Sequence, residues 1–309
     1  MKKRLLNTKR LIQLVLSLCL ILVSANISWG QAQTIGSFPY VDGGFEGQAV
    51  GTLADFSAAV TSTAWTKTAA SGASSIGSTG PRTGNRCATG NITSTSFTRV
   101  LNSPTVTSGF PASGSSYVVQ YYIKNADMAS IPVGIGNTGG GYVSPTVTTA
   151  NTNWLKYTQV VTSSAAAVPA TPAYTTYVGI GRVKVTAPTT TQSFLVDDVV
   201  IYAGTVADTD APVAASGGVV SGLTVSWTAS SDVDGGGYMV VRYSSAPNPD
   251  NDPNANGIYA LGNTITSGVV PLTGTVVYIG TGISFTDAVA GSTSGSDYYK
   301  IYTVDKAFN

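Results

Sequence analysis

Residues Ser116–Lys124 read SYVVQYYIK, and this stretch decides the fold class. Its side chains fall into two alternating sets, as in a β-strand, where successive side chains point to opposite faces of the sheet. The more apolar face carries Tyr117, Val119, Tyr121 and Ile123. The other face carries Val118, Gln120, Tyr122 and Lys124. We predict that the first face lies in a core and that the second is half solvated.

Strand-like sequence patterns also occur along the rest of the chain. Short runs of β-branched and aromatic residues alternate with clusters of Gly, Asn, Pro and Ser, and helical periodicity is nowhere sustained. This pattern is typical of all-β sandwiches. Further strands are predicted at Trp154–Val161, Tyr174–Val185, Ser193–Tyr202, Leu223–Thr228, Tyr238–Tyr243, Val276–Ile279, Ser284–Thr286 and Tyr298–Val304.

The chain after residue 30 is long enough for two domains. The predicted boundary is Ala203–Pro212, AGTVADTDAP, where a strand pattern stops and then restarts. We therefore predict one β-sandwich over residues 31–205 and a second over residues 206–309. Between the later strands, Ser245–Gly257 is too rich in Pro and Asn for a strand.

The N-terminus has the pattern of a secretory signal peptide. A basic start, MKKRLLNTKR, precedes an apolar run and small residues that suit cleavage after Gly30 or Ala32. A signal anchor is the alternative, but the apolar run is short of the roughly 20 residues that span a bilayer. We expect the protein to be secreted or displayed at the cell surface.

The net charge of +1 combines two segments of opposite sign. Residues 1–30 hold five basic residues and no acid, so their removal leaves 11 basic (16 − 5) and 15 acidic residues. The remaining chain has a net charge of −4 and no basic run. This argues against nucleic acid and against an anionic membrane surface as partners.

The residue types in this sequence give little support for a catalytic role. The chain has no histidine, which excludes Ser-His-Asp and Cys-His catalysis and His-ligated metals. Glu46 is the one glutamate after the signal, and Asp197 and Asp198 point to opposite faces of their strand unless a bulge intervenes. Cys87 stands alone after cleavage. We expect it to be a small, partly buried residue, with pairing between chains as the alternative.

Glycan binding is the sharpest functional hypothesis. Sugars pack their C–H faces on exposed aromatic rings, while amides and charged groups bind their hydroxyls. Tyr122, flanked by Gln120 and Lys124, has this chemistry, and Trp65 and Tyr142 are further candidates in less regular segments. Core or edge packing is the alternative for each aromatic residue. Trp154 and Trp227 are expected in the core.

The first predicted domain resembles the CenC-like jelly-roll carbohydrate-binding modules of secreted bacterial proteins. The resemblance rests on Val41–Gly47 (VDGGFEG), on the YVVQYYIK strand followed by Trp154–Tyr157 (WLKY), and on Phe194–Tyr202 (FLVDDVVIY). It implies a jelly roll that binds polysaccharide. It also implies a structural calcium near the opening Glu and the closing Asp pair, here Glu46 with Asp197 or Asp198.

An Asp hydrogen-bonded to backbone amides is the alternative to this calcium site. A second acidic segment, Asp250–Asn254, begins like a calcium loop. Ala255 and Leu261, however, replace the Gly and Glu of an EF-hand.

The second predicted domain resembles fibronectin type III-like modules of secreted multidomain Bacteroidetes proteins. The resemblance rests on Asp210–Pro212, on Leu223–Trp227 (LTVSW), and on the later runs GTVVYIGTGISFTD and YYKIYTVD. Asp297 stands where these modules have a corner tyrosine, so that tyrosine's hydroxyl contact is not expected. The last strand is expected after Asn309, so we expect further domains in the same chain.

These observations predict a non-catalytic, secreted binding protein: a jelly roll for carbohydrate and a fibronectin-like spacer. Two alternatives stay open. The modules could be the ancillary N-terminal part of a larger secreted hydrolase, and a catalytic domain downstream would reveal this. They could also form a structural adhesin or filament, which repeated modules downstream would favour.

Overall fold

The computed structural model describes residues 34–35, 38–39, 42–55, 64–67, 73–92, 101–104, 116–124, 133–135, 142–143, 152–162, 178–180, 192–232, 234, 236–248, 251–265, 272–288 and 297–309. Every regular element within these residues is a β-strand, which confirms the predicted all-β class. In the same residues no helix has the length and apolar character needed to cross a membrane. The predicted signal segment lies outside the described residues.

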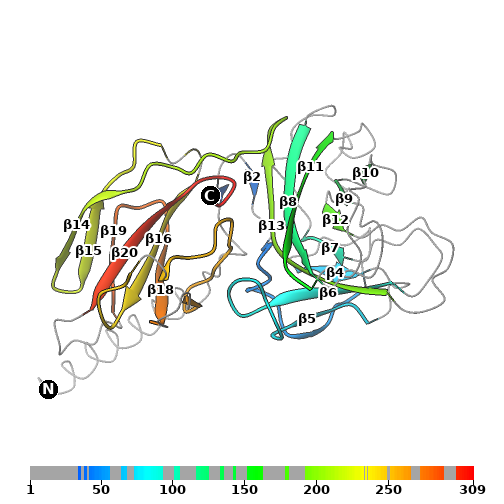
Figure 1. The fold of residues 1–309 in the computed structure, drawn as a ribbon, viewed down its shortest axis with the longest axis horizontal. Helices are drawn as coiled ribbons and strands as arrows, with labels where there is room; N and C mark the ends of the chain where they lie inside the picture. The colour runs from blue at the N-terminus through cyan, green and yellow to red at the C-terminus, as the bar shows by residue number, and fades with distance from the viewer. Residues whose placement is uncertain are drawn as a thin grey trace, which may run out of the picture.

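The described part of the first module, residues 34–203, contains two large antiparallel sheets and one two-stranded sheet (Figure 1). In spatial order the larger sheet consists of β11 (Leu155–Thr162), β8 (Ser116–Lys124), β13 (Gln192–Ala203), β6 (Cys87–Ile92), β5 (Ser75–Gly77) and β3 (Gly51–Thr52). The smaller consists of β10 (Tyr142–Val143), β9 (Val133–Ile135), β12 (Val178–Ile180), β7 (Leu101–Asn102) and β4 (Thr66–Lys67). β1 (Thr34–Ile35) pairs with β2 (Phe38–Pro39).

Strand β8 lies between β11 and β13, and both of its faces are covered. Tyr117, Val119, Tyr121 and Ile123 have no exposed surface, so the prediction of a core face is confirmed. The prediction of a half-solvated second face is wrong, because Gln120 is 1% and Tyr122 9% exposed. Alternation identifies two faces of a strand, but it does not reveal a second module that covers the outer one.

That second module, residues 216–309, contains two further antiparallel sheets. One consists of β14 (Ser216–Ser221), β15 (Thr224–Thr228) and β19 (Ser284–Thr286). The other consists of β17 (Thr264–Ile265), β18 (Gly274–Gly280), β16 (Gly237–Tyr243) and β20 (Tyr298–Val304). Trp227 is buried, as predicted, and its ring lies 5.4 Å from that of Tyr238 and 5.6 Å from that of Tyr278.

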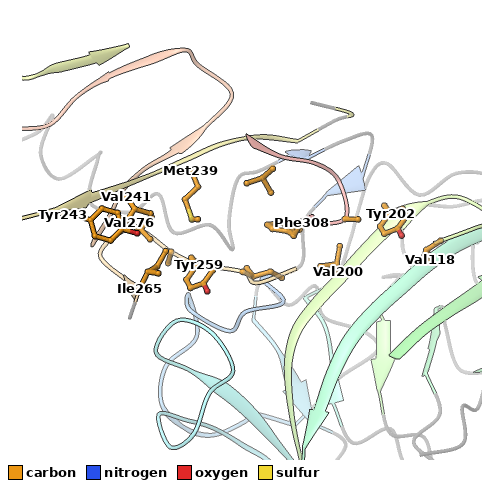
Figure 2. Packing of buried hydrophobic residues seen from close by; sticks show 14 residues of the cluster. Val118, Val200, Tyr202, Met239, Val241, Tyr243, Tyr259, Ile265, Val276 and Phe308 are labelled. Carbon is orange, nitrogen blue, oxygen red and sulfur yellow. The ribbon is translucent and has the colours of Figure 1, made fainter. Parts of the chain in front are cut away.

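The two modules share a hydrophobic cluster, which we call the junction core (Figure 2). The first module contributes Val118, Val200 and Tyr202, from the outer faces of β8 and β13. The second module contributes Met239, Val241, Tyr243, Ile258, Tyr259, Ala260, Ile265, Val276, Val304, Ala307 and Phe308. The larger sheet of the first module therefore lies between the smaller sheet and the second module, as Figure 1 shows.

Candidate binding site at the junction of the two modules

The opening segment, residues 42–48, lies between the closing strand β13 and the second module. Val199 of β13 donates its N–H to the Gly43 carbonyl at 3.0 Å. A Cβ on Gly43 would lie 1.7 Å from the Val199 carbonyl oxygen, and one on Gly44 would lie 2.9 Å from Ile258 of the second module. Only glycine permits such close approach of backbones, so the GG of VDGGFEG has a steric reason.

Trp65 holds this segment in place. Its ring nitrogen donates to the Asp42 carbonyl at 2.9 Å, and its backbone N–H donates to the Gln48 side chain at 3.0 Å. Its ring lies 4.8 Å from that of Phe45. Trp65 is 1% exposed, which contradicts the exposure we expected for a sugar-binding platform. Its hydrogen bonds and packing give it a structural role.

A β-bulge places both aspartates of the closing strand against one segment. The pairing of β13 with β8 shifts register between Asp197 and Val200, and Asp198 has a positive φ of 51°. Asp197 accepts hydrogen bonds from the N–H groups of Arg82, at 2.8 Å, and Thr83. Asp198 accepts from the Thr83 hydroxyl and, at 2.6 Å, from the Arg82 guanidinium. The bulge thus removes the opposite-face arrangement of a regular strand.

Asp198 also ties the modules together. Its carboxylate accepts a hydrogen bond from the N–H of Ile258 at 2.7 Å. The Arg82 guanidinium, which pairs with Asp198, also donates a hydrogen bond to the carbonyl of Ala255 at 2.7 Å. Burial raises the pKa of Asp198, while Arg82 acts in the opposite direction. Burial and the adjacent Asp198 raise the pKa of Asp197 well above its usual value. Arg82 and Asp198 form a buried, hydrogen-bonded ion pair, and removing one partner of such a pair is strongly destabilising.

Glu46 makes a second cross-module contact. One carboxylate oxygen accepts the N–H groups of Asn85 and Arg86, at 2.7 and 2.8 Å, and the other accepts the Asn263 amide at 2.8 Å. Burial raises the pKa of Glu46, and these hydrogen bonds lower it in part.

This arrangement does not fit the calcium site that the resemblance implies. Calcium needs several oxygen ligands that face one point. The oxygens of Glu46, Asp197 and Asp198 instead face N–H and O–H donors or the Arg82 guanidinium. Among the described residues, no three acidic, Cys or His side chains are grouped to hold a metal. Asp250, in the second calcium-like segment, lies outside the described residues.

The predicted ligand-binding strand face is covered by the second module. Asn256 of the second module accepts hydrogen bonds from the Tyr122 hydroxyl at 3.5 Å and from Lys156 at 2.9 Å, while the Arg82 guanidinium of the first module lies 3.5 Å from the centre of the Tyr122 ring. Gln120 of the same strand is buried, and Lys124 is half-buried at the end of β8. The side chain of Tyr142 lies outside the described residues. The face of Gln120, Tyr122 and Lys124 is therefore an interface between modules.

Cys87 is buried in β6, as the sequence led us to expect of a small apolar residue. Burial raises the pKa of its thiol to about 12. Because the thiolate is the reactive form, this cysteine is not a nucleophile at neutral pH.

Two hollows flank the segment 252–259 of the second module, next to the junction. The apolar hollow, of about 180 Å³, has a lining that includes Met239, Tyr259, Tyr302, Val304 and Phe308. The polar hollow, of about 230 Å³, is lined by Arg82, Thr83 and Gly84 of the first module and by Asp252, Asn254, Tyr259, Thr264 and Ile265 of the second. Asp252, Asn254 and Tyr259 line both hollows and form the wall between them.

Sequence reasoning missed Arg82, Thr83, Asn256 and Tyr259, and it considered Asn254 only as part of a calcium-like loop. Their positions depend on contacts between the modules, such as the hydrogen bond from the Arg82 guanidinium to the Ala255 carbonyl, whose members lie 173 residues apart. One signal was available: the long Pro- and Asn-rich loop after β16. Long loops in compact domains are often functional.

No family model matches the chain, and a search of curated proteins finds no relative. Among solved structures, the N-terminal cellulose-binding domain of Cellulomonas fimi β-1,4-glucanase C is 18% identical, with 57% of this chain and 100% of that chain covered and a TM-score of 0.29. The CBM22-1 xylan-binding domain from Paenibacillus barcinonensis is 11% identical, with 52% and 95% covered and a TM-score of 0.32. A β-1,2-glucanase from Parabacteroides distasonis is 12% identical, with 76% and 32% covered and a TM-score of 0.38. All three similarities are weak.

Proposed function

We propose that this chain is an exported, non-catalytic protein whose first module binds carbohydrate and whose fibronectin-like second module supports it rigidly. One observation carries the proposal. The three segments that resemble carbohydrate-binding modules adjoin in and beside one sheet. The opening segment bonds to β13 through Gly43 and Val199, and β13 and β11 pair with β8 on either side.

The state of the carboxylates supports a non-catalytic role. Glycoside hydrolysis usually needs two carboxyl groups that face one sugar. Asp42, Glu46, Asp197 and Asp198 instead accept hydrogen bonds from neighbouring protein groups, and the three aspartates are at most 2% exposed. These groups stabilise the packing of the opening segment and of the two modules.

Export is supported by the pattern of residues 1–30 and by the mildly acidic chain that follows it. Such a chain has no electrostatic attraction for nucleic acid or anionic membranes, and an uncharged polysaccharide suits it better.

Affinity electrophoresis of residues 31–309 through gels that contain hydroxyethylcellulose or xylan tests the proposal. We expect retardation in at least one gel, no release of reducing ends, and the same mobility with EDTA, since Glu46, Asp197 and Asp198 accept hydrogen bonds from protein groups. Unretarded migration in these gels and in a wider polysaccharide panel would contradict carbohydrate binding. Loss of binding in EDTA would restore the calcium hypothesis.

A further inference from the structure

The two hollows differ in chemistry and share one wall. Tyrosine and phenylalanine rings line the apolar hollow, whereas a guanidinium, a carboxylate, an amide and hydroxyl groups line the polar one. A sugar presents the same two characters, apolar C–H faces and a rim of hydroxyls, and aromatic surfaces beside polar groups bind both.

The wall is held in place from both modules. The Tyr259 hydroxyl accepts the N–H of Asn254 at 2.9 Å, and the Asn254 amide donates to the carbonyl of Arg82 at 3.3 Å. Asp252 accepts the Tyr302 hydroxyl at 2.9 Å and pairs with the Lys300 ammonium. Because these contacts exist before any ligand arrives, binding would cost little additional ordering of the wall.

Charge at the hollows is compensated within the protein. The cation of Arg82 is paired with Asp198, and the anion of Asp252 is paired with Lys300. Neither sign dominates, so the hollows have no net field that would select an acidic or a basic ligand. Asp252 and Asn254 are nevertheless exposed and within reach of a ligand's hydroxyls.

We propose that the two hollows form one binding site for a neutral oligosaccharide, with Asp252 and Asn254 as its hydrogen-bonding groups and Tyr259 and Tyr302 as its apolar surface. This inference rests on the proposed carbohydrate binding but places the four named binding groups in the second module, with Arg82, Thr83 and Gly84 of the first module completing the polar hollow. The second module is then part of the binding surface as well as a support.

Calorimetric titration of residues 31–309 with cellotetraose and xylotetraose tests the site. We expect Asp252→Asn and Asn254→Ala each to weaken binding by about tenfold, because each removes a charged or amide hydrogen bond to the ligand. Asp232→Asn and Asn153→Ala alter exposed residues elsewhere and serve as matched controls with unchanged affinity. Thermal unfolding of every variant verifies that its fold is retained.

A filling variant gives an independent measurement. Thr264 is exposed at the edge of the polar hollow, and Thr264→Phe places a ring there without removing Asp252 or Asn254. We expect it to abolish binding. If the parent protein binds but all three variants bind equally well, the site is wrong while the proposed function stands. If the parent protein binds neither these sugars nor any polysaccharide, both are wrong.

Discussion

At the scale of single residues, the junction is dominated by carboxylates that the fold removes from water. Asp42 is 2% exposed and accepts hydrogen bonds from the Gln48 amide, at 2.5 Å, and from the N–H of Gly47. Burial disfavours its charged form and raises its pKa from 3.8 to about 6. Its folded state therefore holds a proton that the unfolded chain has already lost at pH 5.

This shift predicts a pH-dependent stability. Below about pH 4, Asp42 is protonated in both the folded and the unfolded protein. Above about pH 6 it is ionised in both, and the folded protein then holds a buried charge. Asp42 alone should lower the free energy of unfolding by about 3 kcal/mol as the pH rises through this window. Urea unfolding between pH 4 and 7 measures it.

The variant Asp42→Asn cannot titrate and should reduce the slope of stability against pH. The substitution should not abolish the slope, because the pKa values of Glu46 and Asp197 are also raised in the folded protein. Equal slopes for the parent protein and Asp42→Asn would show that Asp42 does not titrate as expected.

At the scale of elements, the opening segment and the bulge of β13 form a matched pair. The bulge turns both aspartates toward Arg82 and Thr83, and the glycines of the opening segment allow its backbone to reach Val199. The two elements meet at the hydrogen bond from the Val199 N–H to the Gly43 carbonyl.

Gly43→Ala should therefore destabilise the protein by about 1–3 kcal/mol or more, because the new Cβ overlaps the fixed carbonyl of Val199. Chemical denaturation at neutral pH measures the loss. The control is Gly204→Ala, whose Cβ would meet its nearest neighbours at 3.6 Å, and we expect little change there. Similar stability of the two variants would argue against the close approach.

At the scale of the whole molecule, hydrophobic residues of the two modules form a common core. Val118, Val200 and Tyr202 of the first module pack in the same cluster as Tyr259 and Phe308 of the second (Figure 2). Polar contacts of Asp198, Glu46 and Asn256 surround this cluster.

We expect residues 31–309 to unfold in a single calorimetric transition. Residues 31–205 alone should melt at a lower temperature and bind a hydrophobic dye, since each apolar side chain removed from the junction core loses about 1.5–3 kcal/mol of burial. Two separate transitions, with the isolated first module melting unchanged, would contradict this coupling.

Much of the secondary structure could be predicted from the sequence. The predicted strands Ser116–Lys124, Ser284–Thr286 and Tyr298–Val304 match β8, β19 and β20 residue for residue. Their signal is local, because alternation and β-branched composition depend on neighbours in the chain. The burial of Trp227 followed from the same pattern.

The candidate site could not be predicted in this way. Sequence alternation identified Tyr122 as a side chain on the outer face of its sheet, and only the tertiary structure showed that the second module covers that face. The same applies to Asp197 and Asp198, whose orientation depends on a bulge, and to the polar hollow, whose lining comes from both modules. The sequence by itself determined where strands form and which side chains share a face. The tertiary structure decided which faces meet, because contacts such as Arg82–Asp198 join residues that are remote in the chain.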